Sequence, residues 1–497
     1  MHLPDQKNKL IYWGIGIKCW KCLTAYPEIV PDAFLDSNYE EGSWKGKPVY
    51  NPTSYKDWEN SFIVVTIRKE EECFEYMEAL GLKRGQDYTS CPDFFNYKEM
   101  TSEEMLAHAE DRIRCNPDYL GRELITGPIF SSRVSDELIR FFNAYVEQNQ
   151  DERLLLLTGL NVITEERAEE LIGFPVINIS SISSKGVVEQ KKHLEILCDL
   201  LKPIKLLIWG GWTEATFFLR DLATDRGLGY AHFEHGFIPG TIQCDKEGIA
   251  GYGEVVNHAG YFRKYPVLSN IELFNRVKRY IIESRADTGV FRTLQSDRKQ
   301  IEKIIAGQGK IIFLVGTGTV GWDVREGSAF WKKAVSEEYN SKEEVFKDVL
   351  ETVRKNGWKL IYKPHPGEKD LFCESDMEAK DVAIIRYTSI DELLQMSDVV
   401  VTVSTAVSYK ALFYEKPLVE LGKSGMYGQG CSYEVHGDLE EKLREALQKG
   451  VTEEQKKCFE HHVLTLLNYN HWDDLTHPEL PYGLTVKCRI FDDRREK

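Results

Sequence analysis

Short apolar runs alternate with helix-like segments along most of this chain, and this alternation constrains the fold more than any other feature. Several runs are apolar at nearly every position, which indicates strands whose sheet is covered on both faces. Such strands, separated by helices, are typical of parallel sheets. The runs lie at residues 9–13, 33–35, 61–67, 153–158, 175–179, 205–209, 310–315, 359–362, 382–385 and 398–403. We therefore predict the α/β fold class with Rossmann-like domains.

The domain organisation follows from where this alternation starts and stops. A chain of 497 residues corresponds to about three domains at roughly 100–200 residues each. We predict a small N-terminal Rossmann-like domain at 1–95, a charged helical connector without a strand at 96–150, α/β domains at 151–304 and 305–440, and a helical C-terminal segment at 441–497 that packs back on an earlier domain.

The charge and the cysteines limit the classes of partner. The chain has 63 Lys and Arg against 79 Asp and Glu, a formal charge of −16, which repels nucleic acid and anionic lipid. We expect no nucleic-acid partner. No apolar stretch approaches the roughly 18–20 residues of a membrane span, so any membrane contact is expected to be peripheral. The 11 scattered cysteines fit reduced thiols and, since we read no signal peptide, a cytoplasmic protein.

The segment Lys363-Pro364-His365-Pro366-Gly367 directly follows a predicted strand. It therefore lies at the carboxyl end of a parallel strand, where open α/β sheets bind ligands. A proline-stiffened loop with one ammonium and one imidazole suits a phosphate leaving group, whose developing charge needs preorganised donors. The alternative is an ordinary proline turn with a solvated lysine.

Ser404 and Thr405 follow the strand predicted at 398–403 and precede a helix predicted at 406–413. Hydroxyls and free N–H groups at a helix start can bind an anion. The alternative is a plain helix cap, which is common.

Glu234-His235-Gly236 ends another short apolar run, and a carboxylate beside a glycine at a strand end can act as a base or nucleophile. Asp245 follows, with glycines at 248, 251 and 253, in a loop able to wrap a polar ligand. On residue chemistry alone, a capping carboxylate beside a glycine turn explains this pattern equally well.

The N-terminal Gly14-Ile15-Gly16 follows the first strand, and Asp36 lies twenty residues beyond Gly16 at the next strand end, where a ribose-binding acid belongs. Gly14, Gly16 and Asp36 are therefore a candidate nucleotide site. The glycine pattern at 316–321 lacks such an acid, so we expect no dinucleotide there. The histidines His461, His462, His471 and His477 lack the spacing of metal ligands and are predicted at the surface.

Taken together, residues 150–440 resemble the capsular polysaccharide biosynthesis glycosyltransferases, which include bacterial transferases of 3-deoxy-manno-octulosonic acid (Kdo). The resemblance is carried by Phe233 to Gly236 with Pro239, Thr241, Asp245 and Gly248; by Lys363 to Pro366; and by Ser404 to Ala406 with Ala411-Leu412, Lys416-Pro417, Leu421-Gly422 and Tyr427-Gly428. It implies two Rossmann-like domains facing each other (the GT-B arrangement), the second of which holds the nucleotide of an activated sugar.

Residue by residue, the resemblance implies that Lys363 and His365 bind the donor phosphate, with Ser404, Thr405 and Gly422 beside them. It implies a catalytic role for Glu234 together with His365, and places His235 and Asp245 in the acceptor-side loop. This chain departs from the family at Lys410, where relatives often have a ribose-binding glutamate. A cation cannot accept hydrogen bonds from ribose hydroxyls, so the donor's identity stays open.

The resulting hypothesis is a metal-independent cytoplasmic glycosyltransferase, with or without peripheral contact at the inner face of the membrane. It would need no cofactor beyond a CMP- or UDP-linked sugar donor. Its acceptor would be a growing capsular or other surface glycan or glycolipid, and its partners would include other glycan-assembly proteins. Three alternatives stay open: polyol-phosphate transfer from a CDP donor, nucleotide-sugar epimerisation, and a non-catalytic scaffold whose N-terminal domain senses NAD or a nucleotide.

Overall fold

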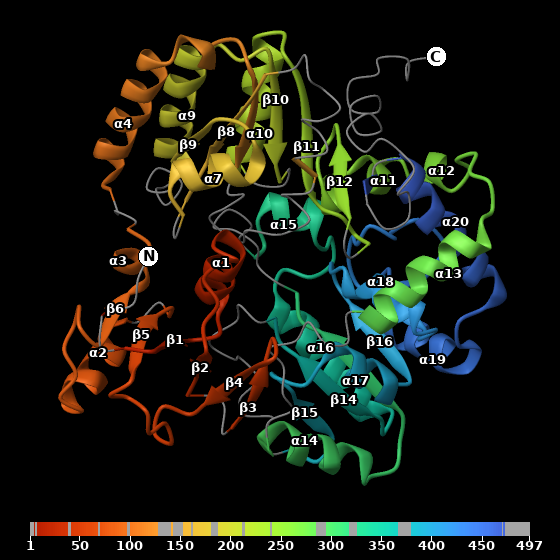
Figure 1. Ribbon diagram of the computed structural model, residues 1–497. Coiled ribbons are helices and arrows are strands. Elements are labelled where there is room, and N and C mark those ends of the chain that lie inside the picture. The colour runs from red at the N-terminus through yellow and green to blue at the C-terminus, as the bar shows by residue number, and fades with distance from the viewer. Residues whose placement is uncertain are drawn as a thin grey trace. The chain divides into compact units, whose positions relative to one another are not determined.

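The computed structural model describes residues 4, 7–37, 41–67, 70–96, 100–127, 141–142, 153–160, 163–179, 187–210, 214–238, 241–284, 295–317, 326–365, 379–469 and 471–472. These residues divide into two compact units, Met1–Trp209 and Gly210–Lys497. Figure 1 labels their helices and strands.

The first unit begins with a mostly parallel sheet in the order β3-β4-β2-β1-β5-β6 (Figure 1). Only the β3–β4 pair is antiparallel. The elements are β1 (Lys9–Trp13), α1 (Ile17–Ala25), β2 (Ala33–Leu35), β3 (Glu41–Trp44), β4 (Lys47–Tyr50), β5 (Ser61–Val65), α2 (Glu70–Ala79), β6 (Tyr88–Ser90) and α3 (Cys91–Phe94). β1 lies between β2 and β5, with Ile11 opposite Ala33 on one side and Ile63 on the other. The chain therefore extends the sheet first to one side of β1 and then to the other, as in Rossmann-like folds.

The rest of this unit contains four parallel strands in the order β10-β7-β8-β9. The elements are α4 (Ser102–Cys115), η1 (Pro117–Tyr119), β7 (Glu123–Gly127), β8 (Leu154–Thr158), α7 (Glu165–Ile172), β9 (Val176–Asn178), α9 (Val187–Leu201) and β10 (Lys205–Trp209). The prediction that 96–150 holds no strand was wrong, because β7 lies there between β8 and β10. The strand begins with the buried Glu123, which pairs with Lys205 at 2.7 Å. Because a charged residue starts the strand, the sequence there does not read as an apolar run.

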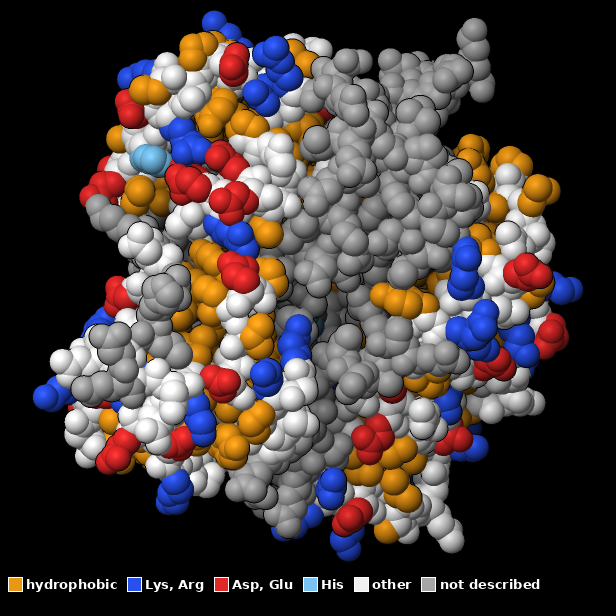
Figure 2. All heavy atoms as spheres, viewed as in Figure 1, with side chains coloured by type: hydrophobic (Ala, Val, Ile, Leu, Met, Phe, Trp, Pro, Cys, Tyr) orange, Lys and Arg blue, Asp and Glu red, His pale blue; other side chains and the backbone are white. Residues whose placement is uncertain are grey.

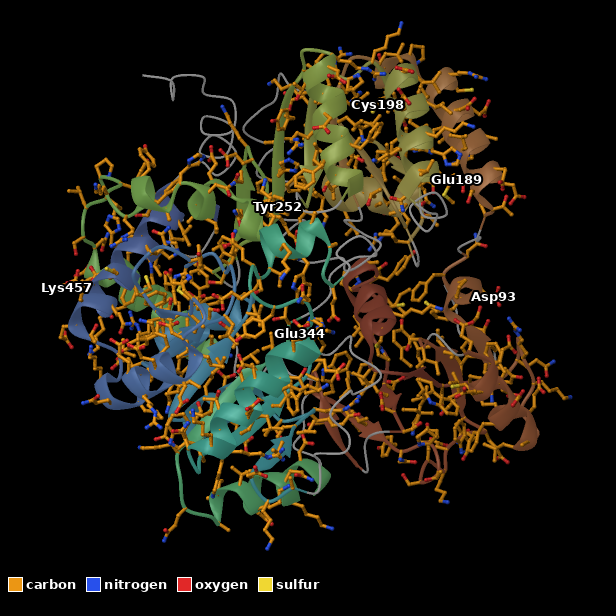
Figure 3. The ribbon with its side chains drawn as sticks, turned by 180° about the vertical axis from the view of Figure 1, so that it is seen from behind. Asp93, Glu189, Cys198, Tyr252, Glu344 and Lys457 are labelled. Carbon is orange, nitrogen blue, oxygen red and sulfur yellow. The ribbon has the colours of Figure 1, made fainter. Side chains whose placement is uncertain are left out.

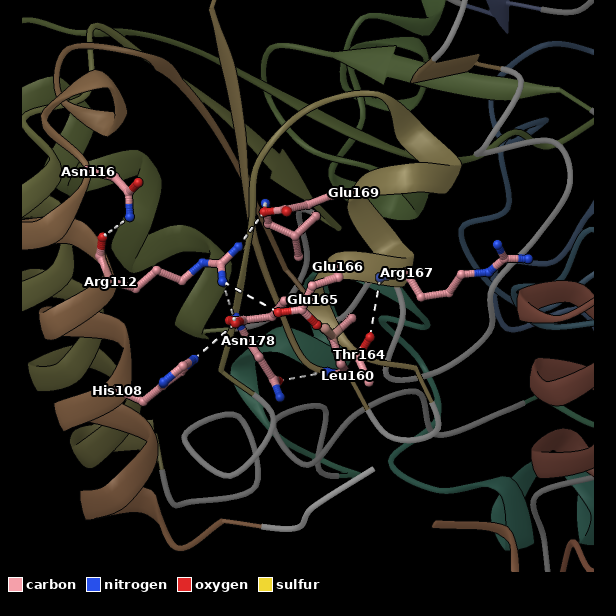
Figure 4. Close-up of polar contacts among 11 residues, drawn as sticks. His108, Arg112, Asn116, Leu160, Thr164, Glu165, Glu166, Arg167, Glu169 and Asn178 are labelled. Carbon is pink, nitrogen blue, oxygen red and sulfur yellow. Dashed lines mark hydrogen bonds and ion pairs between the residues drawn. The ribbon is translucent and has the colours of Figure 1, made fainter. Parts of the chain in front are cut away.

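A polar network joins α4 to α7 and β9 (Figure 4). Arg112 forms ion pairs with Glu165 at 3.1 Å and Glu169 at 2.5 Å. Glu165 also accepts the backbone N–H of Asn178 at 2.6 Å, and Glu169 accepts that of Val176 at 2.9 Å. The carboxylates thus bind a guanidinium and strand N–H groups together, which offsets the cost of burying them.

The second unit opens with three antiparallel strands in the order β19-β12-β11. The elements are α10 (Glu214–Asp225), β11 (Gly229–His235), β12 (Ile242–Asp245), η2 (Ala250–Tyr252), α11 (Glu254–Asn257), α12 (Ala259–Phe262), α13 (Ile271–Arg279), η3 (Tyr280–Ser284) and β19 (His471–Trp472).

A fully parallel sheet in the order β15-β14-β13-β16-β17-β18 follows in the second unit. The elements are α14 (Gln295–Ile305), β13 (Ile311–Val315), α15 (Ala329–Ala334), α16 (Lys342–Lys355), β14 (Lys359–Lys363), β15 (Val382–Ile384), α17 (Ile390–Met396), β16 (Val399–Thr402), α18 (Val407–Phe413), β17 (Leu418–Glu420), β18 (Tyr433–Glu434), α19 (Leu439–Lys449) and α20 (Glu453–Tyr469). Its two faces bury separate clusters, one with Leu360 and Val401 and the other with Ile361 and Val400. Burial on both faces explains the continuous apolar runs in the sequence.

The predicted α/β fold class is confirmed by these mostly parallel sheets and their intervening helices. α20 packs against α13 through a cluster that contains Phe459, Val463, Leu273 and Val277. The prediction of a surface position was wrong for His462, which is buried and shares a 2.8 Å hydrogen bond with the Tyr409 hydroxyl. His477 and the C-terminal residues 473–497 lie outside the described residues.

The surface agrees with the charge pattern of the sequence. Figure 2 shows basic and acidic side chains interspersed over the described part of one face. No helix among the described residues combines the length and the apolar character needed to cross a bilayer.

Candidate functional site

Three strands of the last sheet, β14, β16 and β17, carry the predicted donor-site residues at their carboxyl ends, and β13 lies between β14 and β16. Lys363 is the last residue of β14 and is followed by His365, Ser404 and Thr405 come after β16, and Gly422 comes after β17. Parallel strands end at the same edge, so the sheet brings together motifs up to 59 residues apart in the sequence.

The loop after β13 and the loop after β14 contact each other backbone to backbone. The N–H of Gly316 donates to the carbonyl of Lys363 at 2.7 Å. A Cβ at position 316 would lie 2.7 Å from the nitrogen of His365 and 2.8 Å from the Lys363 oxygen. Gly316 therefore lets the two loops approach closely, and this contact holds the backbone of His365, whose side chain is exposed. Pro366 and Gly367 lie outside the described residues.

Lys363 is buried, and its ammonium lies among backbone carbonyls. Its Nζ donates to the oxygens of Arg386 and Thr388, both at 2.8 Å. Burial lowers the pKa of Lys363 to about 8, opposed by the charge of Asp297. The ammonium therefore holds the 386–388 loop, which follows β15. From the sequence, we had expected Lys363 to bind the donor phosphate.

Asp297 belongs to the same network, although no motif in the sequence indicated it. One of its oxygens, Oδ2, accepts the backbone N–H groups of Tyr387 at 2.8 Å and Thr388 at 2.9 Å, and the Thr388 hydroxyl at 3.1 Å. Asp297 thus holds the loop whose carbonyls bind Lys363. About ninety residues separate Asp297 from its partners, so no local pattern could have indicated this contact.

Ser404 and Thr405 are half-buried and make local contacts. The Ser404 hydroxyl donates to the carbonyl of Lys423 at 3.1 Å. The Thr405 hydroxyl accepts the N–H of Val407, the first residue of α18, at 3.3 Å. The N-cap of α18 is Ala406, which makes no side-chain cap hydrogen bond, so the contact of Thr405 with the N–H two residues later is a local turn before the helix.

Lys410, the departure from the family pattern, lies in an ion pair. Its Nζ is 2.6 Å from Asp391 of α17, which also accepts the Tyr414 hydroxyl at 2.7 Å. Lys410 therefore ties α18 to α17.

The loop after β17 is packed too tightly to admit a side chain at Gly422. A Cβ there would lie 2.1 Å from the carbonyl oxygen of Val335, which accepts the N–H of Lys423 at 2.8 Å. At the end of β17, Glu420 is buried and accepts hydrogen bonds from the hydroxyls of Ser424 and Ser432. Burial raises the pKa of Glu420 to about 7. The available signal for this buried carboxylate was an acidic residue inside the apolar run 418–421, which was not among the predicted site residues.

Glu234 lies near the end of β11, where it is half-buried and opposite Gln243 of β12, and His235 is exposed. Two residues later, the ring of Phe237 stacks on Tyr409 of α18, with centroids 5.7 Å apart and planes at 9°. A Cβ at Gly425 would lie 2.6 Å from the Phe237 ring. The segment after Glu234 therefore packs on the helix that follows Ser404 and Thr405. Pro239 and Gly240 lie outside the described residues.

Asp245 is buried and closes its own loop. It accepts backbone N–H groups of Glu247 at 2.9 Å, Gly248 at 3.2 Å and Glu254 at 3.0 Å. Burial, aided by the charge of Glu254, raises the pKa of Asp245 to about 8. These contacts are those of a structural carboxylate.

The loop that Asp245 closes is anchored on α15. Tyr252, labelled in Figure 3, shares a buried cluster with Trp331 of α15. A Cβ at Gly251 would lie 2.3 Å from the carbonyl oxygen of Ala334.

In the first unit, Gly14 and Asp36 follow β1 and β2 at the carboxyl ends of these strands. Gly14 has a φ of +110°, and a Cβ there would lie 2.1 Å from Cγ2 of Ile67, so only glycine fits. The N–H of Ile15 donates to Oδ2 of Asp36 at 3.2 Å. Gly16 precedes α1 and is exposed.

Comparison with known proteins gives one family match. The family described as "Capsule polysaccharide biosynthesis protein" matches residues 334–471. This range contains Lys363, His365, Ser404, Thr405 and Gly422. No curated protein matches the chain.

Solved structures resemble the chain at low identity. The KpsC beta Kdo 2,7 transferase of Thermosulfurimonas dismutans is 17% identical, with 71% of this chain and 92% of that chain covered and a TM-score of 0.35. The MnaA–UDP co-structure from S. aureus is 13% identical, with 74% and 94% covered and a TM-score of 0.36. A glycosyltransferase from Rickettsia africae is 13% identical, with 75% and 99% covered and a TM-score of 0.37. The match over residues 334–471 confirms the predicted resemblance to the capsule polysaccharide biosynthesis family for the motifs at 363–366 and 404–428, and the motif at 233–248 lies outside this range.

Proposed function

We propose that this chain is a glycosyltransferase that moves a sugar from a nucleotide-activated donor to a growing capsular or other surface polysaccharide. The observation that carries the proposal is the convergence of His365, Ser404, Thr405 and Gly422 at one edge of a parallel sheet, inside the range that matches the capsule family. Such edges are the usual ligand sites of α/β sheets.

The roles follow from exposure and contacts. The imidazole of His365 is exposed on a loop held by Gly316, and its proposed role is to stabilise negative charge that develops on the donor phosphate. Ser404 and Thr405 supply neighbouring hydroxyls. Glu234 lies at a strand end whose following segment packs on α18, and it serves as the catalytic carboxylate of the acceptor side.

Lys363 takes a different role in this proposal. Because its ammonium is bound to the carbonyls of Arg386 and Thr388, it acts as a positioning residue that holds the base of the His365 loop. The phosphate contact itself falls to His365.

Transfer activity of a His365→Ala variant tests the assignment. Loss of one preorganised donor is expected to lower turnover by roughly a hundredfold. The matched control is His436→Ala, which removes an exposed histidine after β18, the last strand on one side of the same sheet. Unchanged turnover of His365→Ala with CMP- and UDP-linked donors contradicts the proposed role, and product analysis separates transfer from epimerisation and from polyol-phosphate transfer.

A Glu234→Gln variant separates chemistry from binding. Turnover is expected to fall by about a hundredfold or more while the donor Kd, measured by calorimetry, changes less than threefold. Glu247→Gln removes an exposed carboxylate paired with His258 and is the control. Loss of donor binding in Glu234→Gln would assign this residue to the donor instead.

The proposed reaction does not require a metal ion. Turnover is therefore expected to be unchanged after treatment with EDTA, and recovery of a lost activity by added Mg²⁺ or Mn²⁺ would contradict this part of the proposal.

A further inference from the structure

A cavity of about 600 Å³ opens at the carboxyl ends of four neighbouring strands of the N-terminal sheet, β4, β2, β1 and β5. Its volume is within the range of small-molecule sites. Its walls come from the ends of these strands, the loops after them and α2, and include Trp13, Asp36, Asn51, Thr53, Glu72 and Tyr76. The cavity lies where the strand order reverses around β1, which is the position of ligand sites in open α/β sheets.

One wall offers oxygen atoms and the other offers rings. Asp36 follows β2, and the amide of Asn51 links the neighbouring loops by donating to the carbonyl of Ser37 at 3.1 Å and accepting the Thr53 hydroxyl at 2.7 Å. On the side of α2, the half-buried ring of Tyr76 meets the buried ring of Trp13 edge to face, with centroids 5.6 Å apart, so Tyr76 is the more exposed ring at the cavity. A ligand with hydroxyls at one end and a flat ring at the other suits these two walls.

The loop after β1 is directed to a carboxylate. The N–H of Ile15, between the two glycines, donates to Oδ2 of Asp36 at 3.2 Å. In dinucleotide-binding folds the glycine loop turns toward a pyrophosphate and the acid after the second strand binds ribose. Here the acid binds the loop itself, which orients its carboxylate at the cavity and places negative charge where a phosphate would approach.

A second carboxylate lies across β1 from the first. Glu72 is in the first turn of α2, the helix after β5, and it is exposed at the cavity. A ligand held by Asp36 and extending past Gly14 would direct its far substituent toward Glu72. Such a substituent is favoured when it is neutral or cationic and disfavoured when it is anionic.

We propose that this cavity binds a nucleoside without a phosphate, whose ribose diol is held by Asp36 and whose 5′ substituent faces Glu72. The site is separate from the proposed sugar-transfer site and does not depend on it. It replaces the NAD or nucleotide of the earlier hypothesis for Gly14, Gly16 and Asp36 with a nucleoside that carries no phosphate.

A charge series at the 5′ position tests this proposal on the full chain by calorimetry. The probes are adenosine, 5′-amino-5′-deoxyadenosine, ADP and NAD, with guanosine, cytidine and uridine to cover the base. We expect at least one nucleoside to bind, its 5′-amino form to bind severalfold more tightly, and its diphosphate to bind at least tenfold more weakly. ADP or NAD binding as tightly as the nucleosides overturns the proposal, as does the absence of binding by all four nucleosides.

Two acids at opposite ends of β2 provide matched variants. Asp32 precedes β2 and accepts the N–H of Leu10 at 2.8 Å, much as Asp36 accepts that of Ile15. We expect Asp36→Asn to weaken nucleoside binding at least tenfold and Asp32→Asn to leave it within twofold. Equal effects of the two variants would mean a structural role and would overturn the assignment of Asp36.

Glu72→Gln is the variant expected to disturb folding least, because the side chain of Glu72 is on the surface of α2. It is expected to keep adenosine affinity within threefold and to abolish the advantage of the 5′-amino form. Persistence of that advantage overturns the proposed direction of the ligand.

Discussion

In both the N-terminal sheet and the C-terminal sheet, candidate ligand-binding residues lie at the carboxyl ends of parallel strands, which are called the N-terminal edge and the C-terminal edge below. The two edges carry different side chains. At the N-terminal edge, the ends of β1 and β2, a carboxylate binds a glycine-loop N–H beside an open cavity. At the C-terminal edge, the ends of β13, β14, β16 and β17, glycines let loops pack backbone to backbone, and the polar side chains are those of His365, Ser404 and Thr405. Sheet topology therefore decides where a ligand can bind, and the side chains at the strand ends decide which ligand it is.

The largest expected effect comes from filling the glycine contact at the C-terminal edge. Gly316→Ala places a Cβ within 2.8 Å of the Lys363 carbonyl oxygen and must displace the His365 loop. We expect turnover to fall by about a hundredfold or more, because small displacements of positioned groups are costly. Gly260→Ala, where a Cβ would meet nothing within 4 Å, is the control and should keep wild-type turnover. Equal turnover of both variants would show that the loop contact does not position His365.

The next effect distinguishes a structural acid from a ligand-binding acid. Asp297→Ala leaves the N–H groups of Tyr387 and Thr388 without their acceptor, which is expected to lower the free energy of unfolding by about 3 kcal/mol. Asp297→Asn retains an acceptor oxygen and should cost about 1 kcal/mol. Asp36 is half-buried at the N-terminal edge, so Asp36→Asn should lower the free energy of unfolding by no more than Asp297→Asn does. Denaturant unfolding measures all three, and a larger loss in Asp36→Asn than in Asp297→Ala would reverse the comparison.

Lys363 predicts a dependence of stability on alkaline pH. Its pKa is about 8 in the fold and 10.5 in a solvated lysine, because burial disfavours the ammonium. Between these values the unfolded chain binds more protons, so the contribution of Lys363 to stability rises with pH, by up to about 1.4 kcal/mol per pH unit. This contribution is lowest below pH 8 and reaches its full value above pH 10.5. The difference in unfolding free energy between wild type and Lys363→Met should therefore grow in favour of wild type across this window, and a difference that stays constant would contradict the burial of the ammonium.

The smallest effect concerns Thr405. Because its hydroxyl accepts the N–H of Val407, Thr405→Ala should lower the free energy of unfolding by about 0.5–1 kcal/mol, and Thr405→Ser should restore it. A donor contact at the same hydroxyl would add a severalfold rise in donor Kd, measured by calorimetry. Unchanged Kd in Thr405→Ala leaves Thr405 with its local turn contact alone and removes it from the proposed donor site.

Most strands were predictable from the sequence because strands buried on both faces require apolar side chains at successive positions. The runs at 205–209 and 382–385 match β10 and β15 to within one residue. β7 was not predicted because its first residue is Glu123, whose charge is compensated by Lys205 from a strand 82 residues later. The burial of His462 was not predicted for a similar reason, since its hydrogen-bond partner Tyr409 lies on another helix.

The sequence by itself determined that this chain forms parallel α/β sheets and that its candidate residues follow strand ends, because both properties depend on local order along the chain. Only the tertiary structure decided where those side chains point. Lys363 is the last residue of β14, and Asp36 directly follows β2. The ammonium of Lys363 binds carbonyls of the 386–388 loop, whereas the carboxylate of Asp36 accepts the N–H of Ile15 between two glycines. The physical reason is that a buried charge takes the partners its neighbours supply, and those neighbours come from distant parts of the sequence.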